Sequence, residues 1–203
     1  MHIQTKYEIT TAKLDAFPAL LTKSKAAFKR STLVRDLVFT PDTRAFTPSL
    51  VERYALSDGT KGLFLRLREE NDLTQGKGAQ TLTLQAYRRQ DRLLINEQLD
   101  LGLDREAHKL ADVLRFLQLL GMDKVVEITK KRDEYALTES TFPCSMMLDQ
   151  VEGITRPFAE IHAFLEKTEI PEYTKQLGQF EKTYGLSEQI ASTRTYFQIL
   201  LNL

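Results

Sequence analysis

The sequence lacks the features that are typical of secreted and membrane proteins. Cys144 is the only cysteine among 203 residues, so no disulfide can form within the chain, and a reducing compartment is expected. No apolar run reaches the roughly 18 residues that a membrane-spanning helix requires. The N-terminus lacks the short apolar core of a signal peptide. We therefore expect a soluble, cytoplasmic protein.

The chain also lacks net charge, because 28 Lys and Arg residues balance 28 Asp and Glu residues. A protein that binds nucleic acid or membrane surfaces through bulk charge carries a positive excess, so neither partner is expected and any anion site has to be local. No Gly-rich phosphate loop and no G-x-S-x-G nucleophile motif is present. Cys144 has no nearby His or second Cys and is expected to be a buried, small apolar residue.

Short strand-like runs, separated by turn residues, dominate the chain. Strands are expected over residues 3–10, 33–40, 53–56, 63–69, 81–87, 93–101, 124–132, 135–137, 145–151 and 158–164. Residues 41–52, which include two prolines, are expected to form a loop. About eight antiparallel strands with helices between them indicate an α+β protein whose strands form a closed or nearly closed barrel. The alternative is an open α+β sheet with helices on one face.

Helices are expected between these strands and at the C-terminus. The first covers residues 14–28, with Pro18 in its first turn, where proline is tolerated. The second covers residues 104–120, with Asp104 as its N-cap. Residues 171–203 are expected to form two further helices that pack on the barrel. The length of the chain predicts that all of this belongs to a single domain.

Two pairs of cations lie on strand-like runs. Arg66 and Arg68 are two residues apart, so both side chains point to one face of their strand. Lys130 and Arg132 repeat this pattern. Two such pairs in one sheet indicate a site for a multiply charged anion, because the Arg fork matches phosphate oxygens. The alternatives are surface cations beside acidic neighbours for the first pair and a solvated charge run for the second.

Several other strands carry polar residues at every second position. The residues that share a face in this way are Thr81, Thr83 and Gln85; Asn96, Gln98 and Asp100; Asp149; and Glu160 with His162. Taken alone, the alternation in each strand is typical of an antiparallel sheet with one solvent-exposed face. Taken together, cations and carboxylates at the same parity favour the polar lining of a barrel that holds a small ligand.

The order of these segments resembles that of the CYTH family, the triphosphate tunnel metalloenzymes. This family includes class IV adenylyl cyclases, thiamine triphosphatases and inorganic triphosphatases. The matching segments are Leu65-Arg66-Leu67-Arg68 to its L-R-x-R strand, Thr81-Leu82-Thr83-Leu84-Gln85 to its T-L-K strand, Leu120-Gly121-Met122 to its L-G-[FM] turn, residues 126–135 to its V-x-K-x-R strand, residues 148–153 and 158–162 to its L-D-x-V-x-G and E-x-E segments, and residues 194–200 to its S-Y-x-x-L-L ending. The resemblance implies a tunnel-like antiparallel barrel.

The acidic half of the family's site is eroded in this chain. The best match to the N-terminal E-x-E-x-K motif is Lys6-Tyr7-Glu8-Ile9-Thr10, which keeps only the middle Glu. The R-x-E-x-E strand is matched by Asn96-Glu97-Gln98-Leu99-Asp100, and the last Glu of E-x-E is His162. The resemblance therefore implies a cationic half that is better preserved than the metal-binding half.

Residue by residue, the resemblance implies three roles. Divalent Mg²⁺ or Mn²⁺ is assigned to Glu8, Asp149 and Glu160. The triphosphate is assigned to Arg66, Arg68, Lys130, Arg132 and Gln85. Glu8, Glu160 and His162 are the candidates for catalysis, in which a metal activates the terminal phosphate or a water and the cations balance phosphoryl charge.

Plain structural roles stay open for each of these groups. Glu8 could form an ordinary surface ion pair. Asp149 and Glu160 could bridge to Arg66 or Arg132 inside a metal-free barrel.

Histidines have their own alternatives. His162 could ligate a metal, act as an acid or base, or be a hydrogen-bonded structural residue. His2 and His108, at the terminus and on a predicted helix, are not expected to take part.

Three functions are compatible with these residues. The first is metal-dependent hydrolysis of an inorganic or small organic triphosphate. The second is the cyclase reaction of the same family, from ATP to cyclic AMP and pyrophosphate. The third is binding of a triphosphate, nucleotide or other polyanion without catalysis. Family members often dimerise, so a homodimer is possible.

Overall fold

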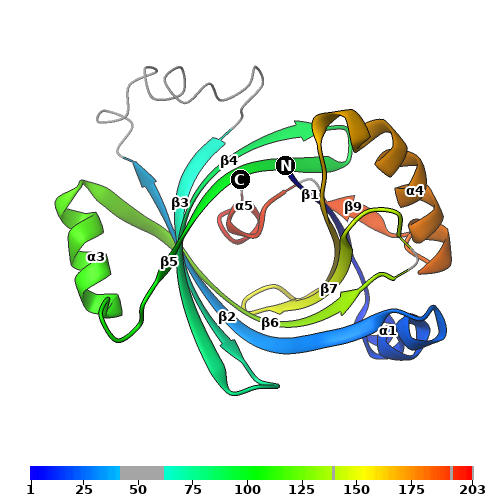
Figure 1. The fold of residues 1–203 in the computed structure, drawn as a ribbon, viewed down its shortest axis with the longest axis horizontal. Coiled ribbons are helices and arrows are strands. Elements are labelled where there is room, and N and C mark those ends of the chain that lie inside the picture. Colours follow the sequence, from blue (N-terminus) through cyan, green and yellow to red (C-terminus); the bar gives the residue numbers. More distant parts are fainter. Residues whose placement is uncertain (42–61, 139, 193, 203) are drawn as a thin grey trace.

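Eight antiparallel strands close into a barrel in the computed structural model, which describes residues 1–41, 62–138, 140–192 and 194–202. These eight are β1 (His2–Glu8), β2 (Ala27–Pro41), β3 (Gly62–Asp72), β4 (Lys77–Gln90), β5 (Leu93–Leu103), β6 (Met122–Ala136), β7 (Cys144–Val151) and β8 (Phe158–Phe164), and a short additional strand is β9 (Ile190–Ser192). Figure 1 looks into this barrel. The prediction of a closed α+β barrel is confirmed, and the open sheet is excluded.

Strand β1 closes the barrel. The order β5-β4-β3-β2-β6-β7-β8-β1 returns to its start because the first half of β1 pairs with β5. The second half of the same edge of β1 pairs with β9, whose residues were not predicted as a strand. Each barrel strand alternates its side chains between the interior and the outer face.

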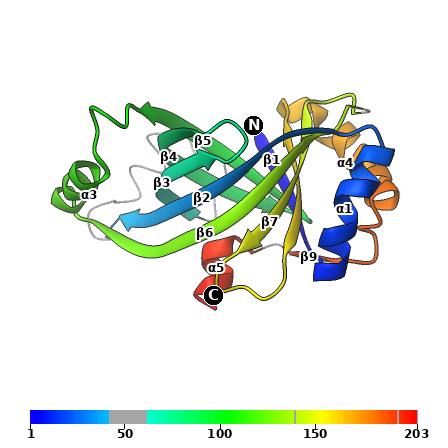
Figure 2. The same cartoon turned by 90° about the horizontal axis from the view of Figure 1, so that it is seen from below.

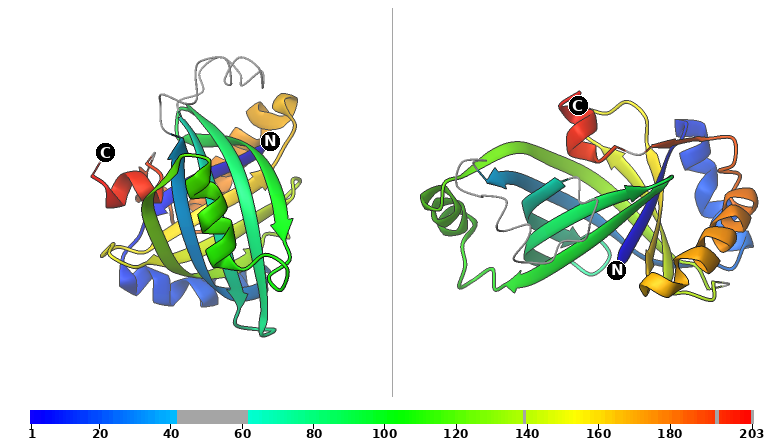
Figure 3. Two further views of the ribbon diagram at one scale, coloured as in Figure 1. Left: turned by 90° about the vertical axis from the view of Figure 1, so that its left-hand side faces the viewer. Right: turned by 90° about the horizontal axis from the view of Figure 1, so that it is seen from above.

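Helices pack on the outer face and at one end of the barrel. They are α1 (Thr11–Lys23), α3 (Leu110–Leu119), α4 (Ile170–Thr183), preceded by a 3₁₀ turn (Lys167–Glu169), and α5 (Tyr196–Leu200). Figures 1 and 2 show α1 and α4 together at one end of the molecule and α3 at the other. Figure 1 shows α5 within the ring of strands, and Figure 3 shows it at one end of the barrel, so α5 lies across that end.

Two apolar clusters hold the helices to the strands. Outward-facing residues of β1, β7 and β8, such as Ile161, pack with Phe17 of α1 and Tyr173 of α4. At the other end, Leu67 of β3 packs with Leu117 of α3. Because these outer faces are apolar and covered, the polar residues at the opposite parity point into the barrel.

The first predicted helix differs in its bounds. Its start is Thr11, because the Thr10 side chain accepts a hydrogen bond from the Lys13 backbone N–H and caps the first turn. Pro18 therefore lies inside the helix and not in its first turn. The helix ends at Lys23, and the residues predicted to complete it begin β2 instead.

Two further bounds differ from prediction. Asp104 does not cap a helix: its carboxylate accepts from the backbone N–H groups of Glu106 and Ala107 in a separate turn, and α3 begins six residues later. The strands expected at 124–132 and 135–137 are one continuous strand, β6.

The strand expected at 53–56 and nearly all of the loop expected at 41–52 lie outside the described residues. Within the described residues, no helix is both long and apolar enough to cross a membrane.

Candidate functional site

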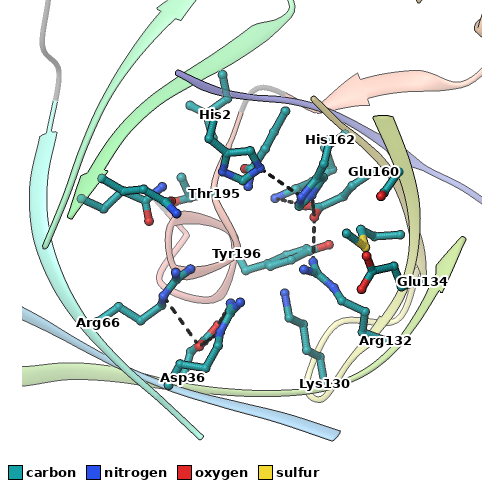
Figure 4. A pocket seen from close by; sticks show the side chains of 18 of the residues that line it. His2, Asp36, Arg66, Lys130, Arg132, Glu134, Glu160, His162, Thr195 and Tyr196 are labelled. Carbon is teal, nitrogen blue, oxygen red and sulfur yellow. Dashed lines mark hydrogen bonds and ion pairs between the residues drawn. The ribbon is translucent and has the colours of Figure 1, made fainter. Parts of the chain in front are cut away.

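The interior of the barrel contains a cavity of about 540 Å³ that is lined mainly by polar and charged side chains. Most of its lining comes from alternate residues of β1, β2, β3, β6, β7 and β8, and one side comes from the start of α5. Figure 4 shows these side chains converging from around the barrel. Both predicted cation pairs belong to the lining.

The first pair meets a buried aspartate of β2. Arg68 donates two hydrogen bonds to Asp36, of 2.7 and 2.8 Å. Arg66 lies 3.9 Å from the same carboxylate. Burial opposes ionisation of Asp36, but the charges of Arg68 and Arg66 prevail and hold its pKa well below the usual range. A single carboxylate therefore serves two guanidinium groups.

Arg66 is the less satisfied of the two. Its Nη2 donates a long hydrogen bond of 3.4 Å to Thr83, while its buried Nε has no hydrogen-bond partner in the described part of the chain. Burial and the adjacent charge of Arg68 lower the pKa of Arg66 to about 10. An anion in the cavity would supply the contacts that Arg66 lacks.

The second pair forms a denser network with the two predicted acids. Arg132 donates to Asp149 and also to Glu160, the latter at 2.8 Å. Lys130 donates to Asp149 at 3.1 Å. Lys130 and Arg132 are buried and are not a solvated charge run, whereas Lys131 between them is exposed. The metal-free bridging of Asp149 and Glu160 by Arg132 is thus present in this structure.

Lys6 and Tyr196 complete this network. Lys6 lies 3.3 Å from Glu160 and 3.6 Å above the centre of the Tyr196 ring. The Tyr196 hydroxyl donates to Asp149 at 2.9 Å, and Lys130 approaches the same ring at 4.8 Å. Helix α5 thereby places an aromatic ring between two lysines, which is a favourable cation–π arrangement.

Positive charge exceeds negative charge in this network. The five cations are Lys6, Arg66, Arg68, Lys130 and Arg132, and the three carboxylates are Asp36, Asp149 and Glu160. Arg30 also lines the cavity and pairs with Glu70 and Glu134, which brings the totals to six cations and five carboxylates. Burial and then the charge of Arg132 lower the pKa of Lys130 to about 8. The excess is therefore electrostatically costly, and a bound anion would relieve it.

His162 forms part of a hydrogen-bonded chain. Its Nε2 lies 2.8 Å from Glu160, and its Nδ1 lies 3.2 Å from Nε2 of His2. A carboxylate only accepts, so His162 Nε2 carries a proton, its Nδ1 accepts, and His2 Nε2 donates. Burial is the main cause that lowers the pKa of both rings, to about 3 for His2. Both histidines are neutral links in this chain.

The structure does not bring Glu8 into the cavity. Glu8 ends β1 opposite Phe158, and its carboxylate lies 3.9 Å from Arg156. The inward row of β1 is His2, Gln4 and Lys6. Their spacing fits E-x-E-x-K four residues earlier than the match made from sequence, with neutral residues at both Glu positions.

Gln85 lies in the cavity lining, as predicted, and donates to Asn96 at 2.6 Å. It contributes an amide where the family carries a Lys. Gln98 also lines the cavity and donates to Asp100. The row of polar residues on β4 and β5 therefore faces inward, as the period-two pattern indicates.

The donor set of the cavity does not fit a divalent cation. Mg²⁺ and Mn²⁺ favour carboxylate oxygens and waters, but Asp36, Asp149 and Glu160 all direct oxygens at Arg or Lys side chains. Across residues 1–41, 62–138, 140–192 and 194–202, no group of three or more His, Cys, Asp or Glu side chains is placed to hold a metal. The Mg²⁺ or Mn²⁺ site stays a prediction of the family resemblance.

Sequence reasoning missed several residues of the site, four of which take part in the networks around Asp36 and Glu160. Asp36 has a detectable signal, because it is a charge at an inward position between Val34 and Val38 of β2. Tyr196 belongs to the C-terminal segment that resembles the family's ending, and only that resemblance indicates a role for it. His2 and Lys6 depend on the register of β1, which the strand's own residues do not reveal.

Cys144 is buried, as expected, and its Sγ lies 3.2 Å from the Ser140 hydroxyl. Burial raises the pKa of its thiol. It is therefore a poor nucleophile.

Comparison with known proteins identifies the family. The CYTH domain matches residues 58–196, which is more than half of the chain. The chain therefore belongs to the CYTH family. No curated protein matches it.

Solved structures share the fold at low sequence identity. The PH1819 protein of Pyrococcus horikoshii has a TM-score of 0.76 and 19% identity, covering 100% of this chain and 99% of that one. A candidate adenylate cyclase of Vibrio parahaemolyticus has a TM-score of 0.69 and 16% identity, covering 100% and 98%. A candidate adenylyl cyclase of Hippeastrum, described as having a dominant triphosphatase activity, has a TM-score of 0.65 and 16% identity, covering 100% and 96%. At these identities the likeness concerns the fold alone.

Proposed function

We propose that this protein binds a small polyphosphate anion inside its barrel without requiring a divalent metal. One observation carries the proposal: the buried network beside the cavity holds five cations and three carboxylates, and positive charge still exceeds negative charge, at six to five, when the cavity-lining Arg30, Glu70 and Glu134 are included. A chain of linked phosphates presents several negative charges within a short length. It matches the two rows of cations better than a single carboxylate or phosphate does.

The size and chemistry of the cavity support the same conclusion. A volume of about 540 Å³ lies in the range of small-molecule sites. The Nε of Arg66, which has no hydrogen-bond partner among the described residues, is a donor that an incoming phosphate oxygen can use. Asp36 and Asp149 hold the other cations in place before the ligand arrives, which reduces the ordering cost of binding.

The second candidate is the metal-dependent triphosphatase that the family resemblance implies. Membership of the CYTH family and the Hippeastrum neighbour's reported activity favour it. The donor set argues against it, because the inward residues of β1 are His2, Gln4 and Lys6. The cyclase reaction is the third candidate and requires a base site as well as the phosphate site.

Binding is tested with tripolyphosphate by calorimetry, once in EDTA and once in Mg²⁺. We expect binding of similar affinity in both, because the cations and not a metal hold the anion. Lys130→Met should weaken binding about tenfold or more, since it removes a charged donor. Lys131→Met is the matched control, because Lys131 is the exposed neighbour on the same strand. Absence of binding in both buffers, or equal loss in both variants, would overturn the proposal.

Catalysis is tested separately by phosphate release from tripolyphosphate and ATP with Mg²⁺, Mn²⁺ or EDTA. Metal-dependent release that Glu160→Ala abolishes would establish the second candidate. Formation of cyclic AMP, detected by mass spectrometry, would establish the third. Binding without release supports a binding protein.

A further inference from the structure

Strand β5 has a free edge along its second half. Its residues 94–96 pair with β1 and close the barrel, but in the described part of the chain no strand pairs with this edge from Glu97 to Leu103. Residues 98–102 of this stretch are all exposed. A free edge presents unpaired backbone N–H and C=O groups, which readily pair with another strand. The second half of β5 is therefore open to a partner.

The outer face of this stretch is apolar. Leu99 and Leu101 are 71% and 58% exposed, although leucine is usually buried. They lie opposite Leu84 and Leu82 on β4, so the leucine surface continues across both strands. A leucine surface that adjoins a free edge indicates a protein partner rather than a small polar ligand.

Opposite charges flank the leucines of β5. The residues at the same parity are Glu97, Leu99, Leu101 and Leu103, and Arg105 follows two residues beyond the end of the strand. This row is self-complementary when it runs antiparallel to a second copy of itself. With Leu101 at the centre, Leu99 lies opposite the partner's Leu103. In the same register, Glu97 lies opposite the partner's Arg105.

We propose that the free edge of β5 is an interface with a second copy of this chain. Two β5 strands pair antiparallel about a two-fold axis at Leu101, and the two sheets become continuous. The unlike charges at the two ends of the row favour a second copy as the partner, because each copy supplies one half of both ion pairs. This interface does not depend on the proposed binding of an anion in the cavity.

The register is set by charge and by the position of β1. A pair centred on Asp100 would place two carboxylates directly opposite each other, which is destabilising. A pair centred on Leu99 would place Leu103 opposite the partner's Ile95, whose edge is already occupied by β1. The register centred on Leu101 avoids both problems and matches the length of the free stretch.

Pairing of the two copies would also support the wall of the cavity. Gln98 lies within the free stretch of β5, and its side chain lines the cavity. In the described part of a single copy, its backbone pairs with β4 alone. In the dimer a strand lies on each side of it, so this part of the cavity wall should open less often.

Sedimentation velocity from micromolar to submillimolar protein, without ligand, tests the dimer. We expect a dimer whose fraction rises with concentration. Leu101→Lys should raise its dissociation constant about tenfold or more, because two like charges then face each other across the axis. Leu119→Lys is the matched control, since Leu119 is 72% exposed but lies on α3, outside the free edge. It should leave the dissociation constant unchanged.

The charged ends of the row test the register. Glu97→Arg and Arg105→Glu should each weaken the dimer, and the two substitutions together should restore it. Arg105 also donates to Asn71 of its own copy at 3.2 Å. Restoration by the double variant therefore separates the contact between copies from this local contact.

A disulfide between copies provides a second measurement. Residues directly opposite in an antiparallel pair have Cα atoms about 4.5–5.5 Å apart, a separation that a disulfide can bridge. Leu101→Cys should therefore form a covalent dimer under mild oxidation, whereas Leu119→Cys should not. The native Cys144 is buried and does not compete.

A monomer at every concentration, with no covalent dimer from Leu101→Cys, would overturn the proposal. A dimer that Leu101→Lys and Leu119→Lys weaken equally, or that neither weakens, would do the same. Failure of the double charge variant to restore the dimer would refute the register centred on Leu101.

Discussion

Arg66 and Arg68 provide a test of the charge excess because their surroundings differ although both face Asp36. Arg68 makes two hydrogen bonds to that carboxylate, whereas Arg66 lies at 3.9 Å and its Nε has no hydrogen-bond partner in the part of the chain that the structure describes. We predict that Arg66→Met leaves the ligand-free protein as stable as before or more stable. Arg68→Met should destabilise it.

The magnitude follows from the free energy of the buried charge. Burial and the charge of Arg68 lower the pKa of Arg66 from 12.5 to about 10. The folded state therefore disfavours the charged form by about 3 kcal/mol, and this cost is present at every pH below about 10. Replacing the charge with an apolar side chain of similar length removes the cost, so we expect a gain of about 1–3 kcal/mol in the free energy of unfolding.

Arg68→Met has the opposite sign. It leaves Asp36, which is 4% exposed, without its two hydrogen bonds. Breaking a buried pair by removing one partner costs about 3–5 kcal/mol. Both variants should nevertheless weaken tripolyphosphate binding by about 1.5–3 kcal/mol, because each removes a charged donor from the site.

Urea unfolding at pH 7 in EDTA, followed by circular dichroism, measures the stability of the two variants, and calorimetry measures their binding. An unchanged slope with urea confirms that only stability has changed. If Arg66→Met lost as much stability as Arg68→Met, the excess of positive charge would not lower the stability of the folded protein. If neither variant weakened binding, the pair would lie outside the anion site.

Two further predictions concern the second network. Burial and the charge of Arg132 lower the pKa of Lys130 to about 8. Above this pH the free protein loses the positive charge of Lys130. A bound anion favours that charge, so binding of tripolyphosphate takes up a proton. The Kd for tripolyphosphate should then rise by up to tenfold per pH unit between about pH 8 and 9.5, and calorimetry across this range measures this rise. The same dependence of the Kd on pH in Lys130→Met would contradict the prediction. Asp149→Asn should lower the free energy of unfolding by about 3–5 kcal/mol, since it removes the carboxylate charge that Lys130 and Arg132 share and leaves Arg132 with Glu160 alone. Saturating tripolyphosphate should restore part of this loss in a thermal melt, and absence of any rescue would place the anion away from Arg132.

Much of the architecture can be predicted from the amino-acid sequence, because strand periodicity is a local property. Alternation at every second residue identified all eight barrel strands that the structure describes, although their ends moved. The same alternation placed Arg66 with Arg68, and Lys130 with Arg132, on inward faces. It also assigned Gln85 to the interior. These assignments need only the geometry of an extended chain.

The pairing of charged residues inside the barrel depends on the three-dimensional fold. Asp36 and Arg68 are 32 residues apart, and the Tyr196 hydroxyl reaches Asp149 from 47 residues away. No local pattern encodes such pairs, because they depend on how the strands are ordered around the barrel. The pairing of β1 with β5, β8 and β9 likewise decided that Lys6 lies inside and Glu8 at the end. The face on which a charged residue lies can be predicted from the local sequence of its strand. The residue that neutralises that charge depends on how the sheet closes.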